Sequence, residues 1–219
     1  MNIVTRKLSI TLLTLASALL THNAAAATLI DNFSDFQIAT NEVNSLPLTP
    51  IDSTDLKNVQ RTLTATSSTG FSFTEIISDG GLLTVNNGFD TETTSLYYSF
   101  SSIDLSAVAN AFMLTIEDDD QLPYQIQLIA NGRSSYGFAD FVGIGQHTIN
   151  FSKFSNPNVF NHLESLEIKF QGATAWDGHF SRLMADMNSV PEPSVLALLF
   201  VGLLGLSGIS RRKYARIDV

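Results

Sequence analysis

The sequence predicts an all-β fold, a single antiparallel β-sandwich of the jelly-roll type, and three observations support this prediction. Several segments alternate apolar and polar residues with a period of two, which is typical of half-buried strands. Turn-forming residues separate these segments at intervals of roughly 10 to 15 residues, a spacing that suits an antiparallel sandwich. No central stretch sustains a helical period, and the many Thr and Ser residues fit strands better than helices.

The alternating segments, taken in chain order, are the predicted strands. They cover residues 70–76, 82–85, 96–100, 112–116, 124–129, 147–151 and 163–170. In the last segment Leu166, Ile168 and Phe170 are predicted to face inward, with Glu167 and Lys169 outward. Turn signals lie at 79–81, 86–88, 131–132 and 143–145. Residues 41–55, which include two prolines, are predicted to form a long loop.

The N-terminal residues have the three-part pattern of a secretory signal. Arg6 and Lys7 form a positive region, residues 8–20 are apolar and uncharged, and alanines occupy 24–27. Signal peptidase is predicted to cleave after Ala26 or Ala27. Residues 1–26 are therefore predicted to be a signal helix, and residues 27–189 a single sandwich domain.

A second apolar segment lies near the C-terminal end. Residues 194–210 carry no charge, and the basic cluster 211–216 follows them, beginning with Arg211, Arg212 and Lys213. As a helix this segment would extend about 25 Å, close to the thickness of the hydrocarbon core of a bilayer. Because cations stay on the cytoplasmic side, the preceding domain is predicted to lie outside the inner membrane.

Four residues, Val190, Pro191, Glu192 and Pro193, precede this segment, so that a proline-rich motif, the predicted transmembrane helix 194–210 and the basic cluster follow one another. With its parts in this order, the tail 190–216 closely resembles the PEP-CTERM sorting tail of exported proteins of Gram-negative bacteria. The resemblance implies transient anchoring in the inner membrane and processing by an exosortase near this motif. It also implies delivery to the cell surface or extracellular matrix, and an association with exopolysaccharide and biofilm production.

The predicted domain is acidic and contains no cysteine. Residues 28–189 include 19 Asp and Glu against 6 Lys and Arg, a net charge of -13. Such a surface repels phosphate groups, so nucleic acid is excluded as a partner. The lack of cysteine excludes disulfides and thiol chemistry, which leaves core burial as the source of stability.

Five short segments are scattered along the domain: Ile30-Asp31-Asn32-Phe33, Arg61-Thr62-Leu63, Ile103-Asp104-Leu105-Ser106, Asp118-Asp119-Asp120 and Ala175-Trp176-Asp177-Gly178. In their order along the chain they resemble galactose-binding-like carbohydrate modules, which are β-sandwiches. This resemblance implies the fold and transfers no binding site.

Trp176, the only tryptophan, is the first candidate for ligand binding. An exposed indole stacks on the apolar face of a sugar ring, while Asp177 or His179 would bond the sugar hydroxyls. Tyr124, together with Arg133, Tyr136 and Asp140, offers similar chemistry. The alternative is a tryptophan packed at the edge of the sandwich, with Asp177-Gly178 forming a turn.

Carboxylates suggest calcium as the one candidate cofactor. Asp118, Asp119 and Asp120 follow the predicted strand 112–116, and a strand-end loop of this kind offers oxygen ligands to Ca²⁺. Asp31 and Asp177 form an alternative set that would tie the chain start to a late strand. A third interpretation is a solvated acidic turn without any ion.

The sequence carries none of the patterns typical of hydrolases or metalloenzymes. It has no Gly-x-Ser-x-Gly elbow, no His-Glu-x-x-His pattern and no phosphate-binding glycine loop. We therefore expect a non-catalytic, exosortase-processed protein with a structural or interaction role at the cell surface or in the matrix, with exopolysaccharide as a partner. The alternatives are a carbohydrate-binding module and a secreted polysaccharide hydrolase.

Overall fold

The computed structural model of the chain describes residues 27–41, 46–66, 74–88, 93–119, 124–141, 143–172 and 175–187. The predicted signal helix (1–26) and sorting tail (190–216) lie outside these residues. No helix in the described ranges combines the length and the hydropathy that a bilayer span requires.

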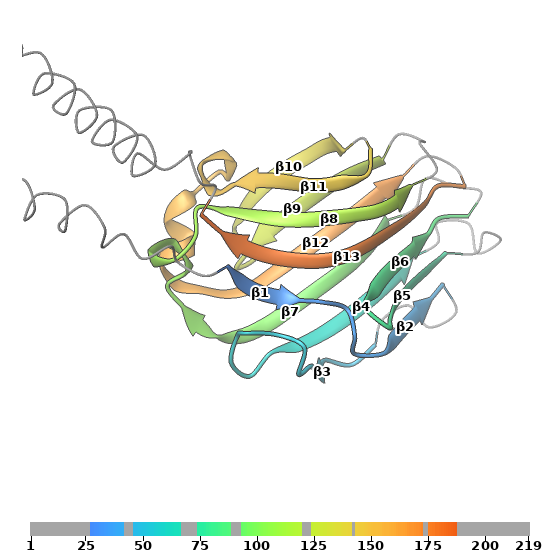
Figure 1. Cartoon of the computed structure of the whole chain (residues 1–219), viewed down its shortest axis with the longest axis horizontal. Helices are drawn as coiled ribbons and strands as arrows, with labels where there is room; N and C mark the ends of the chain where they lie inside the picture. The colour runs from blue at the N-terminus through green and yellow to red at the C-terminus, as the bar shows by residue number, and fades with distance from the viewer. Residues whose placement is uncertain are drawn as a thin grey trace, which may run out of the picture. The chain divides into compact units, whose positions relative to one another are not determined.

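One layer of the domain is a seven-stranded antiparallel sheet with the order β11-β8-β13-β6-β5-β2, in which β1 also pairs with β13 (Figure 1). Its strands are β1 (Thr28–Asp31), β2 (Gln37–Thr40), β5 (Glu75–Asp79), β6 (Leu82–Asn86), β8 (Ala111–Asp119), β11 (Gly145–Asn150) and β13 (Asp177–Asp186). The second layer is a six-stranded antiparallel sheet with the order β10-β9-β12-β7-β4-β3. Its strands are β3 (Thr49–Pro50), β4 (Gln60–Thr66), β7 (Thr93–Ile103), β9 (Tyr124–Ala130), β10 (Ser134–Phe141) and β12 (Leu163–Gly172).

The predicted antiparallel sandwich is confirmed. Six of the seven predicted strands overlap β6, β7, β8, β9, β11 and β12. The seventh, 70–76, lies largely outside the described residues, and its last two residues begin β5. The short strand β3 interrupts the predicted loop 41–55, where Pro50 is tolerated because β3 is an edge strand. At the predicted turn 131–132, Asn131 and Gly132 have φ of 50° and 63°, as a tight hairpin turn requires.

The two ends of the sandwich interior are filled in different ways. Near the start of β8, Phe112 packs against Phe151 and Phe160, and the rings of Phe151 and Phe160 stack with centroids 3.8 Å apart. Two short 3₁₀ helices, η2 (Phe151–Lys153) and η3 (Pro157–His162), supply these rings; a third, η1 (Leu105–Ala107), follows β7. Near the other end of β8, Trp176 fills the interior instead. Burial of these large side chains is the main contribution to stability in a domain without disulfides.

A buried ion pair joins the two sheets. Arg61 on β4 and Asp31 on β1 are both fully buried, and Arg61 Nη1 lies 2.6 Å from Asp31 Oδ2. The same carboxylate accepts hydrogen bonds from the Tyr98 hydroxyl on β7 and from the backbone N–H of Phe33, each at 2.7 Å. Because β1 belongs to one sheet while β4 and β7 belong to the other, these contacts tie the layers together.

Further hydrogen bonds engage the other two nitrogens of the Arg61 guanidinium. Arg61 Nε donates to the side chain of Gln37 on β2 at 2.7 Å, and Nη2 donates to the carbonyl of Asp35. Gln37 Nε2 in turn donates to the carbonyl of Arg61 at 3.0 Å. A buried ion pair is stable only when its remaining donors and acceptors are satisfied in this way.

Replacing Arg61 with Met should lower the free energy of unfolding by about 3–5 kcal/mol, because Asp31 would remain buried without its countercharge. Urea unfolding followed by circular dichroism measures this loss. Lys169→Met is the matched control: Lys169 makes a surface pair with Glu167 at 3.5 Å, and exposed pairs contribute at most about 1 kcal/mol. Equal losses for the two variants would show that the buried pair does not hold the sheets together.

Tyr98 should make the domain sensitive to alkali. Burial, and then the neighbouring Asp31 carboxylate, raise the pKa of Tyr98 well above its ordinary value of 10.0. Below pH 10 the phenol is neutral in both the folded and the unfolded protein, so it gives no pH dependence. Above pH 10 the phenol ionises in the unfolded chain only, so the free energy of unfolding falls as pH rises. Urea unfolding at pH about 8 and about 11 should show this fall in the wild type and a smaller one in Tyr98→Phe. A parallel fall in both proteins would contradict the assignment.

Candidate functional site

The structure places Trp176 in the core, which corrects its predicted role as an exposed sugar-stacking residue. Its side chain is 0 % exposed, and its ring stacks on Tyr124, itself 1 % exposed, with centroids 4.4 Å apart. Gly172 on β12 and Gly178 on β13 make room for the indole, because a Cβ at either position would come within 2.7 Å and 2.5 Å of the ring. Trp176 and Tyr124 are therefore packing residues, and the prediction that they contact a ligand is wrong.

Asp177 and His179, the other predicted ligand residues, lie on the outer face of the seven-stranded sheet. They alternate along β13 with the buried Gly178 and Phe180, and both are partly exposed. His179 pairs across the sheet with Asp118 on β8. Because the indole lies inside the sandwich, these two residues do not form one site with Trp176.

The structure separates the two predicted calcium ligands Asp31 and Asp177. Asp31 pairs with Leu183 on β13, six residues from Asp177, which corresponds to roughly 20 Å along the strand. Its carboxylate is also already bonded to Arg61 and Tyr98. One ion therefore cannot bridge Asp31 and Asp177.

The acidic cluster itself begins within a strand rather than in a loop. β8 continues through Asp119, and Asp118 and Asp119 pair with His179 and Gly178. Asp120 lies outside the described residues. In the parts of the chain that the structure describes, no three His, Asp or Glu side chains converge as a metal site would require. Calcium binding by Asp118, Asp119 and Asp120 stays a prediction.

The outer face of the six-stranded sheet is a continuous polar surface, which we call the sheet face. Its side chains are partly exposed, alternate with buried core residues, and come from four adjacent strands. They are Thr62 and Thr64 on β4, Thr93, Ser95, Tyr97 and Ser99 on β7, Glu167, Lys169 and Gln171 on β12, and Gln125, Gln127 and Ile129 on β9. Hydroxyl and amide groups therefore dominate this surface.

Tyr97 lies near the middle of the sheet face. It pairs with Thr62 on β4 and with Glu167 on β12, and Glu167 pairs in turn with Ile129 on β9. Glu167 and Lys169 neutralise each other across 3.5 Å. Tyr97 thus offers an aromatic surface among hydrogen-bonding groups whose charges cancel, an arrangement suited to ligands that have both apolar surfaces and many hydroxyls.

A second aromatic residue lies at the rim of the sheet face. β10 contains a bulge between Tyr136 and Ala139, so that Gly137 and Phe138 together oppose Gln127. Phe138 is 41 % exposed, and Asp140 nearby accepts a hydrogen bond from Gln125 at 2.8 Å. Bulges commonly redirect a side chain at a functional edge.

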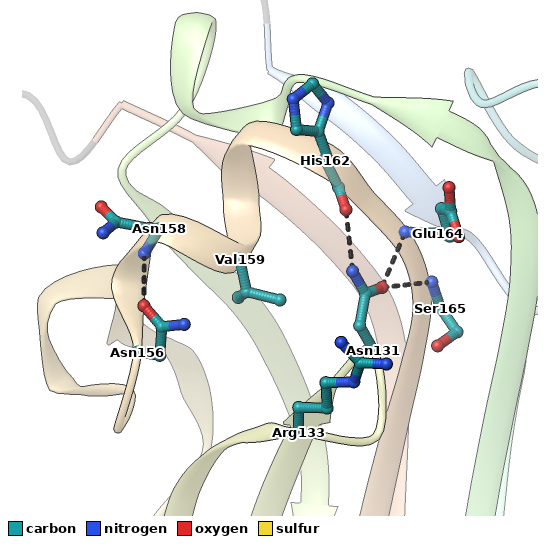
Figure 2. Close-up of a pocket in the computed structure, with 8 residues that line it drawn as sticks. All are labelled: Asn131, Arg133, Asn156, Asn158, Val159, His162, Glu164 and Ser165. Atoms are coloured by element: carbon teal, nitrogen blue, oxygen red, sulfur yellow. Dashed lines mark hydrogen bonds between the residues drawn. The ribbon is translucent and has the colours of Figure 1, made fainter.

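At one end of the sheet face lies a polar pocket of about 420 Å³, drawn in Figure 2. Asn131, in the turn between β9 and β10, holds the backbone segments that line this pocket. Its Nδ2 donates to the carbonyl of His162 at 2.7 Å, and its Oδ1 accepts from the backbone N–H groups of Glu164 and Ser165 at 2.8 and 3.0 Å (Figure 2). These bonds lock the β9–β10 turn to the junction of η3 and β12.

A second set of bonds holds the opposite wall of the pocket. The Ser134 hydroxyl donates to the carbonyl of Asn156 at 2.9 Å and accepts from its backbone N–H at 2.8 Å. The Asn156 side chain caps η3 by accepting from Asn158 N. The pocket is therefore largely preformed, and Arg133, Val159 and His162 line it together with Asn158 and Glu164.

Sequence reasoning missed the sheet face and, apart from Arg133, the pocket. Alternation in the segment 163–170 correctly placed Glu167 and Lys169 outward. It carried no information that Tyr97, 70 residues earlier, lies beside Glu167. The Asn131-Gly132 turn signal marked one wall of the pocket, but the approach of η3 to this turn had no local signal.

The comparisons with known proteins concern the two parts of the chain separately. The PEP-CTERM protein-sorting motif matches residues 189–213, which confirms the predicted tail. Comparison with curated proteins gives no match.

Among solved structures, the chain is similar to a family 11 carbohydrate-binding module of a cellulosomal cellulase from Clostridium thermocellum. The two are 14 % identical with a TM-score of 0.43, covering 76 % of this chain and 99 % of that one. A xylan-binding module from Roseburia intestinalis is 12 % identical with a TM-score of 0.32, covering 68 % and 96 %. Likenesses this distant do not identify a ligand, and the sandwich is established by its own strand pairing. The chain carries a PEP-CTERM sorting motif, which marks it for export, membrane anchoring and exosortase processing.

Proposed function

We propose that the protein is a non-catalytic, exosortase-processed component of the cell surface or extracellular matrix whose sandwich domain binds exopolysaccharide on the sheet face. The observation that carries the proposal is the position of Tyr97 among hydroxyl and amide side chains on an open, rigid sheet. A sugar ring has an apolar C–H face and a rim of hydroxyls, so it matches an aromatic ring surrounded by hydrogen-bonding groups.

The charge distribution supports a neutral polymer as ligand. The domain has a net charge of -13, yet Glu167 and Lys169 on the sheet face are paired with each other, and Asp140 lies at its rim. A neutral polysaccharide can bind this uncharged patch without repulsion, whereas an acidic polysaccharide would be repelled by the net negative charge of the domain.

The geometry of the sheet face favours binding over hydrolysis. Glycoside hydrolases place two carboxyl groups roughly 5 to 9.5 Å apart. Glu167 on β12 and Asp140 on β10 are two strands and four residue positions apart, which corresponds to about 17 Å. Glu167 is also held in its pair with Lys169. This separation supports the non-catalytic assignment.

Tyr97→Ala should weaken polysaccharide binding about tenfold, because losing an aromatic stacking surface costs about 1.4 kcal/mol. Binding is measured by isothermal titration of the 27–187 domain with a panel of soluble polysaccharides. The panel comprises β-1,3-1,4-glucan, xylan, dextran and the exopolysaccharide of the bacterium that makes this protein.

Phe36→Ala is the matched control for Tyr97→Ala. Phe36 is 64 % exposed and lies next to β2 of the seven-stranded sheet, so its removal should leave binding unchanged. Lack of binding to every polysaccharide of the panel by the wild type would refute the binding role and leave a purely structural one.

Replacing Pro191, Glu192 and Pro193 with alanines should leave the precursor in the inner membrane, because exosortase would no longer process the tail. Fractionation and immunoblotting of cells that express the full chain show where the protein accumulates and at what length. Replacing Ile217, Asp218 and Val219, which follow the basic cluster, with alanines is the control and should leave processing intact. Release of the motif variant at the processed length would contradict the assignment.

A further inference from the structure

The pocket at the end of the sheet face has four polar side chains available for a ligand. Arg133, Asn158, His162 and Glu164 are exposed, and in the described parts of the chain their side chains form no hydrogen bond or ion pair. Their backbone groups, by contrast, are held in place: those of His162 and Glu164 by the Asn131 side chain, that of Arg133 by the β9–β10 turn, and that of Asn158 by the Asn156 side chain. The pocket therefore presents free side chains on a fixed frame (Figure 2).

The pocket contains both hydrogen-bond donors and acceptors, and one positive and one negative side chain. Arg133 is a permanent cation with up to five donors, Glu164 is an acceptor, and the amide of Asn158 supplies both. Val159 contributes an apolar surface between these groups. Adjacent donors and acceptors around a small apolar surface match the vicinal hydroxyls and C–H groups of one sugar ring, whereas one cation beside one anion does not favour a strongly charged ligand.

The pocket is continuous with the sheet face through Ser165. This residue lines the pocket and lies on β12 opposite Ser99 of β7. Tyr97 is two residues from Ser99 on the same face, so Tyr97 and Ser165 are diagonal neighbours with Cα atoms about 7–8 Å apart. A chain of two or three linked sugars is long enough to reach from the pocket to Tyr97.

We propose that this pocket is a second subsite, which binds one sugar residue of the same polysaccharide while a neighbouring residue stacks on Tyr97. This inference rests on the proposed function. Arg133 and Asn158 donate hydrogen bonds to the hydroxyls of that residue, Glu164 accepts from them, and Val159 contacts the ring carbons. The pocket determines the direction of the glycan, because it fixes one end of the bound segment along β12.

The test uses oligosaccharides of one to six residues, prepared from the polysaccharide that binds the wild type best. Arg133→Gln and Glu164→Gln should each weaken binding of the longer oligosaccharides about tenfold, as expected when a hydrogen bond to a charged group is lost. Arg182→Gln and Glu117→Gln remove the same charges from exposed positions of the seven-stranded sheet and should have no effect. Affinity should also rise steeply between one residue and three, because only a longer chain fills both subsites.

Two outcomes separate this inference from the proposed function. If Tyr97→Ala weakens binding while both pocket variants stay within twofold of the wild type, the pocket is not a subsite and the sheet face alone binds. If the wild type binds none of the oligosaccharides, both proposals fail. Nuclear magnetic resonance of the unmodified domain is independent of how the variants fold: the Arg133 Nε–H and Asn158 amide signals should shift on addition of the hexasaccharide, and unchanged signals would overturn the inference.

Discussion

The buried pair of Asp31 and Arg61 is the constraint on which the arrangement of the two sheets depends. It joins β1 to β4, and through Tyr98 also to β7, so its contacts with Arg61 and Tyr98 both cross between the layers. Hydrophobic burial is non-directional, so apolar packing specifies the alignment of the sheets less strictly than directed hydrogen bonds do. Charged hydrogen bonds have strict geometry, and here they require one alignment of the first strand of the domain with the middle of the opposite sheet.

This alignment also bears on the proposed binding surface. Arg61 and Tyr98 point inward from β4 and β7, and their neighbours Thr62 and Tyr97 therefore point outward. A slip of one residue in β7 would turn Tyr97 into the core and Tyr98 onto the sheet face, and a slip of one residue in β4 would likewise exchange Arg61 and Thr62. The ion pair therefore helps to specify which tyrosine is available to a ligand.

The sequence was sufficient for the fold class because period-two alternation is a local property. Segments such as 124–129 and 163–170 show it clearly and became β9 and β12. β4 was missed because its inward positions include Arg61, whose charge hides the apolar pattern until its partner Asp31 is known. β13 was missed because Gly178 occupies a buried position, where it makes room for Trp176.

The difference between local sequence patterns and contacts between distant residues also explains why the candidate site was predicted poorly. Trp176 is the only tryptophan and stands beside polar residues in sequence, but its burial depends on Gly172 and Gly178, two glycines of different strands that leave a space between them. Tyr97 carries no local sign of function, and its significance arises only from pairing with Thr62 and Glu167. The sorting tail was predictable because its chemistry lies in one continuous segment, whereas a surface assembled from four strands exists only after long-range pairing has set the register.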